Sequence, residues 1–281
     1  AKNAEVAVEV VGDKAGHFRL GTVGEGTDSP VLSLPGKQEE LIHQVIATGT
    51  PTVVVLLNGR PFAIPKLAEK AAAIVETWFP GQEGAGVIVD TLFGNINPGG
   101  KTTVTFSQGG GVQPVVYNTK RMAKGWPELP EFEAVYPFGH GLSYTQFDYS
   151  NLKLSADEVL VDGVIEISCV VKNIGKLPGD EVVQLYVHDK YASVTRPILE
   201  LKGFKRFKLE PEEKKEVIFT LSADLLAFTG IDYRKVIEPG EIIVSIGSSS
   251  RDIRLSESFN LVGDVRFPGE NRVMSSTVVV K

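Results

Sequence analysis

The chain has 281 residues, 42% of them hydrophobic and 23% charged, which is the composition of an ordinary globular protein of about two domains. A net charge of −6 without a Lys/Arg run argues against a nucleic-acid partner. The longest apolar runs, such as 53–57, are far too short to span a membrane. The single cysteine, Cys169, excludes an intrachain disulfide and any multi-cysteine metal site.

The first part of the chain alternates between strand and helix patterns. In chain order we expect a strand over 5–13, a helix over 36–47, a strand over 52–57, a strand near 72–79, a helix near 82–93 and a strand over 102–106. This alternation predicts a mostly parallel sheet with flanking helices, which is an α/β sandwich. Because the chain opens directly on an apparently internal strand, we expect this domain to be truncated at its start.

The second part of the chain is predicted to be all β. Seven β-rich segments separated by turn signals lie at 151–154, 164–172, 181–188, 200–208, 215–221, 241–247 and 252–261. This spacing is typical of an immunoglobulin-like or fibronectin type III β-sandwich. The predicted domains are therefore an α/β domain over 1–118, a connecting segment over 119–147 and a fibronectin type III-like domain over 148–281.

One segment resembles a familiar motif without matching it, and the histidines form no motif at all. Gly99-Gly100-Lys101-Thr102 resembles the end of a phosphate-binding loop, but the first glycine of that motif would fall on Asn95, and a strand rather than a helix is expected to follow. The segment is predicted to be a turn. The four histidines have no metal-ligand spacing, so no metal site is expected.

A glycine-rich loop over 21–29 follows the first strand and carries Glu25 and Asp28. Open α/β sheets bind ligands at the carboxyl ends of their strands, and a carboxyl group on a glycine-flanked loop can act as a general acid. A solvated surface loop is the alternative. Arg60 follows the second strand toward the same edge, where we expect it either to contact a sugar or to form an ion pair or a turn contact within the domain.

Several stretches together resemble the C-terminal half of glycoside hydrolase family 3, the β-glucosidase and β-xylosidase family. The most specific of them are WFPGQEG (78–84), NPGGK (97–101) and PFGHGLSYT (137–145), and the resemblance covers nearly the whole chain in order. Family members have a (β/α) barrel, an α/β sandwich and a fibronectin type III domain. The resemblance implies that this chain holds the second and third of these and lacks the N-terminal barrel.

The resemblance also implies a site. Family 3 enzymes are retaining, so they need a carboxylate nucleophile, which the resemblance assigns to the absent barrel, and an acid/base carboxyl group. The family's acid/base motif is similar to S-G-E-G, and Val23-Gly24-Glu25-Gly26 matches it with valine in place of serine. Glu25 is thus the implied general acid/base. The Asp-Arg pair that often follows in the family is here Asp28-Ser29, a departure from the pattern.

The implied partners are a β-glucoside or oligosaccharide substrate and the N-terminal barrel, as a domain or as a separate chain. Asp28 and Trp126 are the candidate substrate-binding residues, Trp126 either stacking on a sugar ring or anchoring its own loop. Carboxylate chemistry requires no cofactor. The alternatives are a non-catalytic carbohydrate-contacting or scaffolding module, and β-xylosidase or phosphorylase specificity on the same fold. A periplasmic or extracellular compartment is favoured over the cytoplasm.

Overall fold

The computed structural model describes residues 1–18, 20–27, 29, 31–109, 115–120 and 133–281. These residues form two units that interleave along the chain. The first unit contains residues 1–96, 104–109, 115 and 133–137, and the second contains residues 97–103, 116–120 and 138–281.

The first unit is built on a small parallel sheet. Strand β2 (Thr52–Leu57) lies between β1 (Ala7–Gly12) and β3 (Ala73–Glu76), and both pairings are parallel. Residues 54–56 are fully buried, as expected for a central strand that is apolar along its whole length because both of its faces are covered. The predicted parallel sheet is therefore present.

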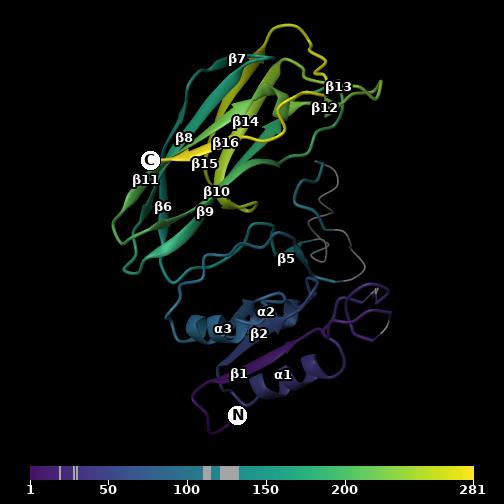
Figure 1. Ribbon diagram of the computed structural model, residues 1–281, viewed down its shortest axis with the longest axis vertical. Coiled ribbons are helices and arrows are strands. Elements are labelled where there is room, and N and C mark those ends of the chain that lie inside the picture. The colour runs from purple at the N-terminus through teal and green to yellow at the C-terminus, as the bar shows by residue number, and fades with distance from the viewer. Residues whose placement is uncertain (19, 28, 30, 110–114, 121–132) are drawn as a thin grey trace. The chain divides into compact units, whose positions relative to one another are not determined.

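This sheet is accompanied by helices α1 (Gln38–Ile46), α2 (Pro65–Lys70) and α3 (Gly84–Leu92), which are labelled in Figure 1. The sequence predicts α1 and α3 but not α2, a helix that begins on a proline, which is favourable at the first helical position. The helices and strands share a core of Val11, Leu34, Ile42, Val54, Leu56, Phe62, Ile64 and Leu67.

The strand predicted over 102–106 is wrong for most of its length. Only β4 (Phe106–Ser107) forms, and it pairs with β5 (Ala134–Tyr136). The backbone N–H of Thr102 donates instead to the carbonyl of His140 at 2.7 Å. The β-branched composition of this segment therefore does not decide its partners, because Thr102 bonds within the second unit whereas Phe106 pairs within the first.

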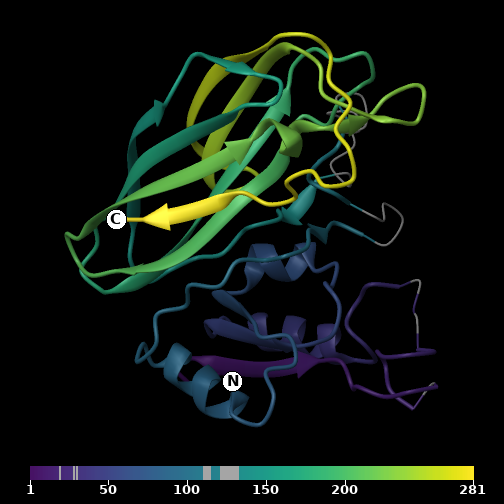
Figure 2. The same ribbon diagram turned by 45° about the horizontal axis from the view of Figure 1, so that its top comes forward.

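The second unit is a sandwich of a five-stranded and a four-stranded sheet. The first sheet has the order β10 (Glu200–Leu209), β9 (Gly179–Asp189), β14 (Gly240–Ser249), β15 (Asp252–Val262) and β7 (Glu158–Leu160). The second has the order β16 (Thr277–Val280), β11 (Lys214–Ser222), β8 (Val164–Asn173) and β6 (Phe147–Leu154), and Figure 2 shows β16, in yellow, at its edge. A 3₁₀ turn (Ala223–Leu226) leads into a small hairpin of β12 (Phe228–Thr229) and β13 (Lys235–Val236).

All seven predicted strands of the sandwich are confirmed. The sequence missed β7 and β16, which lie at the outer edges of the two sheets and are only 3 and 4 residues long. Cys169 lies on β8 and is fully buried in the core, where burial raises the pKa of its thiol to about 12. Cys169 is therefore part of the packed core of the sandwich.

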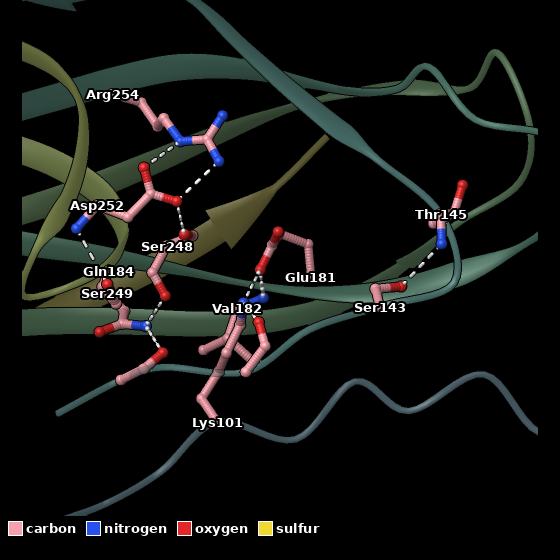
Figure 3. A network of polar contacts seen from close by, with 12 residues as sticks. Lys101, Ser143, Thr145, Glu181, Val182, Gln184, Ser248, Ser249, Asp252 and Arg254 are labelled. Carbon is pink, nitrogen blue, oxygen red and sulfur yellow. Dashed lines mark hydrogen bonds and ion pairs between the residues drawn. The ribbon is translucent and has the colours of Figure 1, made fainter. Parts of the chain in front are cut away.

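The NPGGK segment (97–101) is irregular chain rather than the predicted turn, and its side chains bind to the sandwich. The amino group of Lys101 lies 3.1 Å from a carboxylate oxygen of Glu181, and both side chains are nearly buried (Figure 3). Asn97 accepts a hydrogen bond from the backbone N–H of Tyr144 at 2.7 Å and donates to the carbonyl of Pro178 at 2.9 Å. These contacts explain why the segment belongs to the second unit rather than to the α/β unit.

Tyr149 on β6 provides a stability prediction. Its ring is buried under the Arg254 guanidinium, yet its hydroxyl makes no hydrogen bond within the described residues. Because a buried unsatisfied hydroxyl costs free energy, Tyr149→Phe is expected to raise the free energy of unfolding by about 1 kcal/mol in urea titrations. Tyr186→Phe is the matched control, because the buried Tyr186 hydroxyl donates to Gln184 at 2.5 Å, and it is expected to destabilise. Equal losses in both variants would contradict the prediction.

Candidate active site

The carboxyl ends of the three parallel strands lie at one edge of the sheet in the first unit. The chain leaves β1 at Gly12, β2 at Leu57 and β3 at Glu76, and polar segments follow each of these residues. Ligands of open α/β sheets bind at such an edge. The Glu25 loop follows the first of these strands, as the sequence predicts.

Glu25 is an exposed residue in a turn whose shape depends on its two neighbours. Gly24 and Gly26 have φ angles of 123° and 70°, which residues with a side chain rarely adopt. A Cβ atom on Gly24 would lie only 2.0 Å from the carbonyl oxygen of Gly16. The carbonyl of Glu25 accepts a hydrogen bond from the N–H of Phe18 at 2.7 Å. The backbone of Glu25 is thus held in place, whereas its carboxyl group has no partner among the described residues.

A buried ion pair lies at the base of this loop. The carboxylate of Asp13, the first residue after β1, lies 3.3 Å from the guanidinium of Arg60, and the two side chains are 0% and 16% exposed. Asp13 also accepts hydrogen bonds from the hydroxyl of Thr22 at 2.8 Å and from the N–H of Gly59 at 3.4 Å. Of the two roles left open for Arg60, the structure therefore shows the ion pair within the domain.

Glu76 is a second carboxylate at this edge, and sequence reasoning missed it. It accepts hydrogen bonds from the N–H of Trp78 at 2.9 Å and from the side-chain amide of the fully buried Asn58 at 3.2 Å. Burial raises its pKa to about 7, although these two hydrogen bonds pull the pKa in the opposite direction. The available signal was a carboxylate at the end of an otherwise apolar strand.

The other two candidate site residues, Asp28 and Trp126, lie outside the described residues. Within the described part of the chain, no group of three or more His, Cys, Asp or Glu side chains is arranged to hold a metal ion. No helix among these residues is long and apolar enough to cross a bilayer.

Residues 1–144 match the model of the glycosyl hydrolase family 3 C-terminal domain. The chain belongs to glycosyl hydrolase family 3. Residues 181–250 match a fibronectin type III-like domain, which agrees with the sandwich of the second unit. The predicted architecture of an α/β domain followed by a fibronectin type III-like sandwich is therefore confirmed.

Family 3 relatives include a β-xylosidase of Formosa agariphila, 43% identical over 255 residues, and a periplasmic β-glucosidase of Salmonella typhimurium, 39% identical over 273 residues. These alignments cover 89% and 93% of this chain but only 35% of each relative. Among solved structures, a β-glucosidase from Listeria innocua in complex with glucose is 34% identical, with a TM-score of 0.85 over 94% of this chain and 37% of that chain. This chain thus spans about a third of the length of these proteins.

Proposed function

We propose that this chain is the C-terminal part of a retaining, exo-acting β-glucosidase, in which Glu25 is the general acid/base. The nucleophile is a carboxylate of a preceding barrel, as a domain or as a separate chain. The substrate is a β-glucoside or an oligosaccharide with a terminal, non-reducing β-linked glucose. Support comes from the family match and from relatives named as β-glucosidases.

The proposed reaction has two steps. Glu25 protonates the glycosidic oxygen of the leaving group while the barrel carboxylate attacks the anomeric carbon and forms a glycosyl-enzyme. Glu25, now a carboxylate, then removes a proton from the water that hydrolyses this intermediate. Retention requires the two carboxyl groups to lie about 5–5.5 Å apart.

The observation that carries the proposal is the environment of Glu25. It is exposed at the carboxyl edge of a parallel sheet, in a turn whose conformation requires glycine on both sides of it. Its carboxyl group has no partner among the described residues. A general acid needs this freedom, because its proton must reach the substrate oxygen rather than a neighbouring side chain.

β-Xylosidase activity is the second candidate, because one of the relatives aligned with this chain is named a β-xylosidase. We also propose a periplasmic or extracellular compartment. The Salmonella relative named as periplasmic supports this, and fractionation of the producing organism tests it.

The proposal can be tested in a chimaeric enzyme, in which these 281 residues replace the matching part of the Salmonella typhimurium β-glucosidase. We expect the chimaeric enzyme to hydrolyse p-nitrophenyl β-D-glucoside faster than the β-D-xyloside, and this chain alone to hydrolyse neither. The opposite preference would identify a xylosidase. A folded chimaeric enzyme inactive on both glycosides would favour a non-catalytic module. Activity of the chain alone would contradict the assignment of the nucleophile to a barrel.

A further inference from the structure

Asp13 connects two loops at the carboxyl edge of the sheet through a single buried carboxylate. Its oxygens accept hydrogen bonds from Thr22, which precedes Glu25 by three residues, and from the N–H of Gly59 in the loop after β2. The guanidinium of Arg60 is the third donor, and it lies 3.3 Å from the same carboxylate. A fully buried carboxylate with three such donors is held in one position, and it holds both loops in turn.

Thr22 links Asp13 to the part of the loop that carries Glu25. Its hydroxyl donates to Asp13 and accepts from the N–H of Lys14 at 2.9 Å, so both hydrogen-bonding capacities are used. Its own N–H donates to the carbonyl of Lys14 at 2.7 Å. The returning part of the loop is thus joined to the end of β1 immediately before the Gly24-Glu25-Gly26 turn.

The next residue, Val23, packs closely against the loop after β2. A Cβ atom on Gly59 would lie 3.0 Å from a methyl carbon of Val23 and 2.8 Å from a ring carbon of Phe79, so glycine at position 59 leaves the room that the Val23 side chain occupies. Val23 also forms an isolated bridge with Ala15. The valine that replaces the serine of the family's motif therefore has a packing role beside Glu25.

Arg60 depends on Asp13 for charge compensation. Its guanidinium is largely buried, and its Nε atom has no hydrogen-bond partner among the described residues. Removing the charge of Asp13 would leave a buried cation without its counter-ion, which is costly. The pair is therefore sensitive to a change at either residue.

We propose that Asp13 is a positioning residue for Glu25, acting through Thr22 and supported by its ion pair with Arg60. The inference rests on the proposed acid/base role of Glu25. Asp13 does not touch the substrate. Its buried carboxylate fixes the position of the Thr22 hydroxyl. The short segment from Thr22 in turn fixes the backbone of residue 25, from which the Glu25 carboxyl group extends.

The test compares Thr22→Val, which removes the hydroxyl but keeps the shape, with Thr22→Ser, which restores the hydroxyl. Thr48→Val is the matched control, because the Thr48 side chain is also half-buried and its hydroxyl donates to the carbonyl of Val45. In the chimaeric enzyme, Thr22→Val is expected to lower kcat by about 10- to 100-fold with little change in KM, because a displaced acid/base affects the transition state more than binding. Thr22→Ser is expected to recover most of kcat, and Thr48→Val to leave it unchanged.

A second measurement does not depend on activity. Hydrogen exchange in the 281-residue chain is expected to speed up by about fivefold for the amides of residues 14–27 in Thr22→Val, through loss of a hydrogen bond, and to stay unchanged there in Thr48→Val. Asp13→Asn removes the charge, and it is expected to lower kcat and to speed up hydrogen exchange more than Thr22→Val does.

The outcomes separate the two proposals. If Glu25→Gln abolishes turnover while Thr22→Val behaves like Thr48→Val in kcat and exchange, the positioning role of Asp13 is wrong and the acid/base role stands. If Glu25→Gln leaves turnover unchanged, the acid/base role is wrong, and the positioning role fails with it. Equal losses in kcat for Thr22→Val and Thr22→Ser would also overturn the positioning role, because the hydroxyl would then not be the group that matters.

Discussion

Glu25→Gln in the chimaeric enzyme is expected to lower kcat by about 10²- to 10⁴-fold for a glucoside whose leaving group is a poor one, such as a second sugar. Glutamine keeps the shape of the side chain but has no acidic proton to donate. The backbone contacts of the turn are unaffected, because the N–H of Phe18 bonds to the carbonyl of residue 25 rather than to its side chain. The loss of kcat therefore measures the contribution of proton transfer by Glu25.

The dependence on the leaving group makes this prediction specific. Departure of p-nitrophenolate needs little protonation, so Glu25→Gln is expected to affect formation of the glycosyl-enzyme from the aryl glucoside far less. Hydrolysis of that intermediate then limits turnover, because its water lacks a general base. Azide needs no base, so it is expected to restore turnover in part and to yield a β-glucosyl azide.

Glu69→Gln is the matched control, because Glu69 is an exposed glutamate on α2 of the same unit, away from the carboxyl edge. It is expected to leave kcat, the dependence on the leaving group and the response to azide unchanged. Uniform losses on both kinds of substrate in Glu25→Gln, without azide rescue, would contradict the acid/base role.

Glu76 is expected to make the first unit less stable as the pH rises. Burial raises its pKa in the folded chain from 4.5 to about 7, so the folded state binds a proton that the unfolded state has released. The contribution of this proton to the free energy of unfolding is fully present below about pH 4.5 and is lost as the pH rises to about 7. A change of the pKa from 4.5 to about 7 corresponds to roughly 3–4 kcal/mol of unfolding free energy.

Urea unfolding of the wild type and of Glu76→Gln across this pH range tests the prediction. Glutamine does not titrate, so the variant is expected to lack the pH-dependent part, whatever constant offset its altered hydrogen bonds to Asn58 and Trp78 introduce. Glu69→Gln, an exposed carboxylate, is expected to follow the wild type. The prediction fails if Glu76→Gln and the wild type lose stability in parallel, or if NMR titration places the Glu76 pKa near its ordinary value.

The sequence alone was sufficient for features that depend on neighbouring residues. The run at 52–57 predicted β2 with its observed limits, because an unbroken apolar, β-branched stretch is a strand in most settings. The seven sandwich segments were found for the same reason, and the glycine-rich residues around Glu25 were predicted to form a loop. Family motifs identified the chain because they are contiguous.

The tertiary structure was needed wherever distant residues decide the outcome. Thr102 is a β-branched residue, a type that favours strands. Its hydrogen bond to His140, 38 positions away, nevertheless places it in the second unit. Asp13 and Glu76 look locally like surface carboxylates at strand ends. Only the parallel pairing of the three strands brings Arg60 to the first and Asn58 to the second. Burial and charge compensation are properties of these long-range contacts, so local sequence patterns do not contain them.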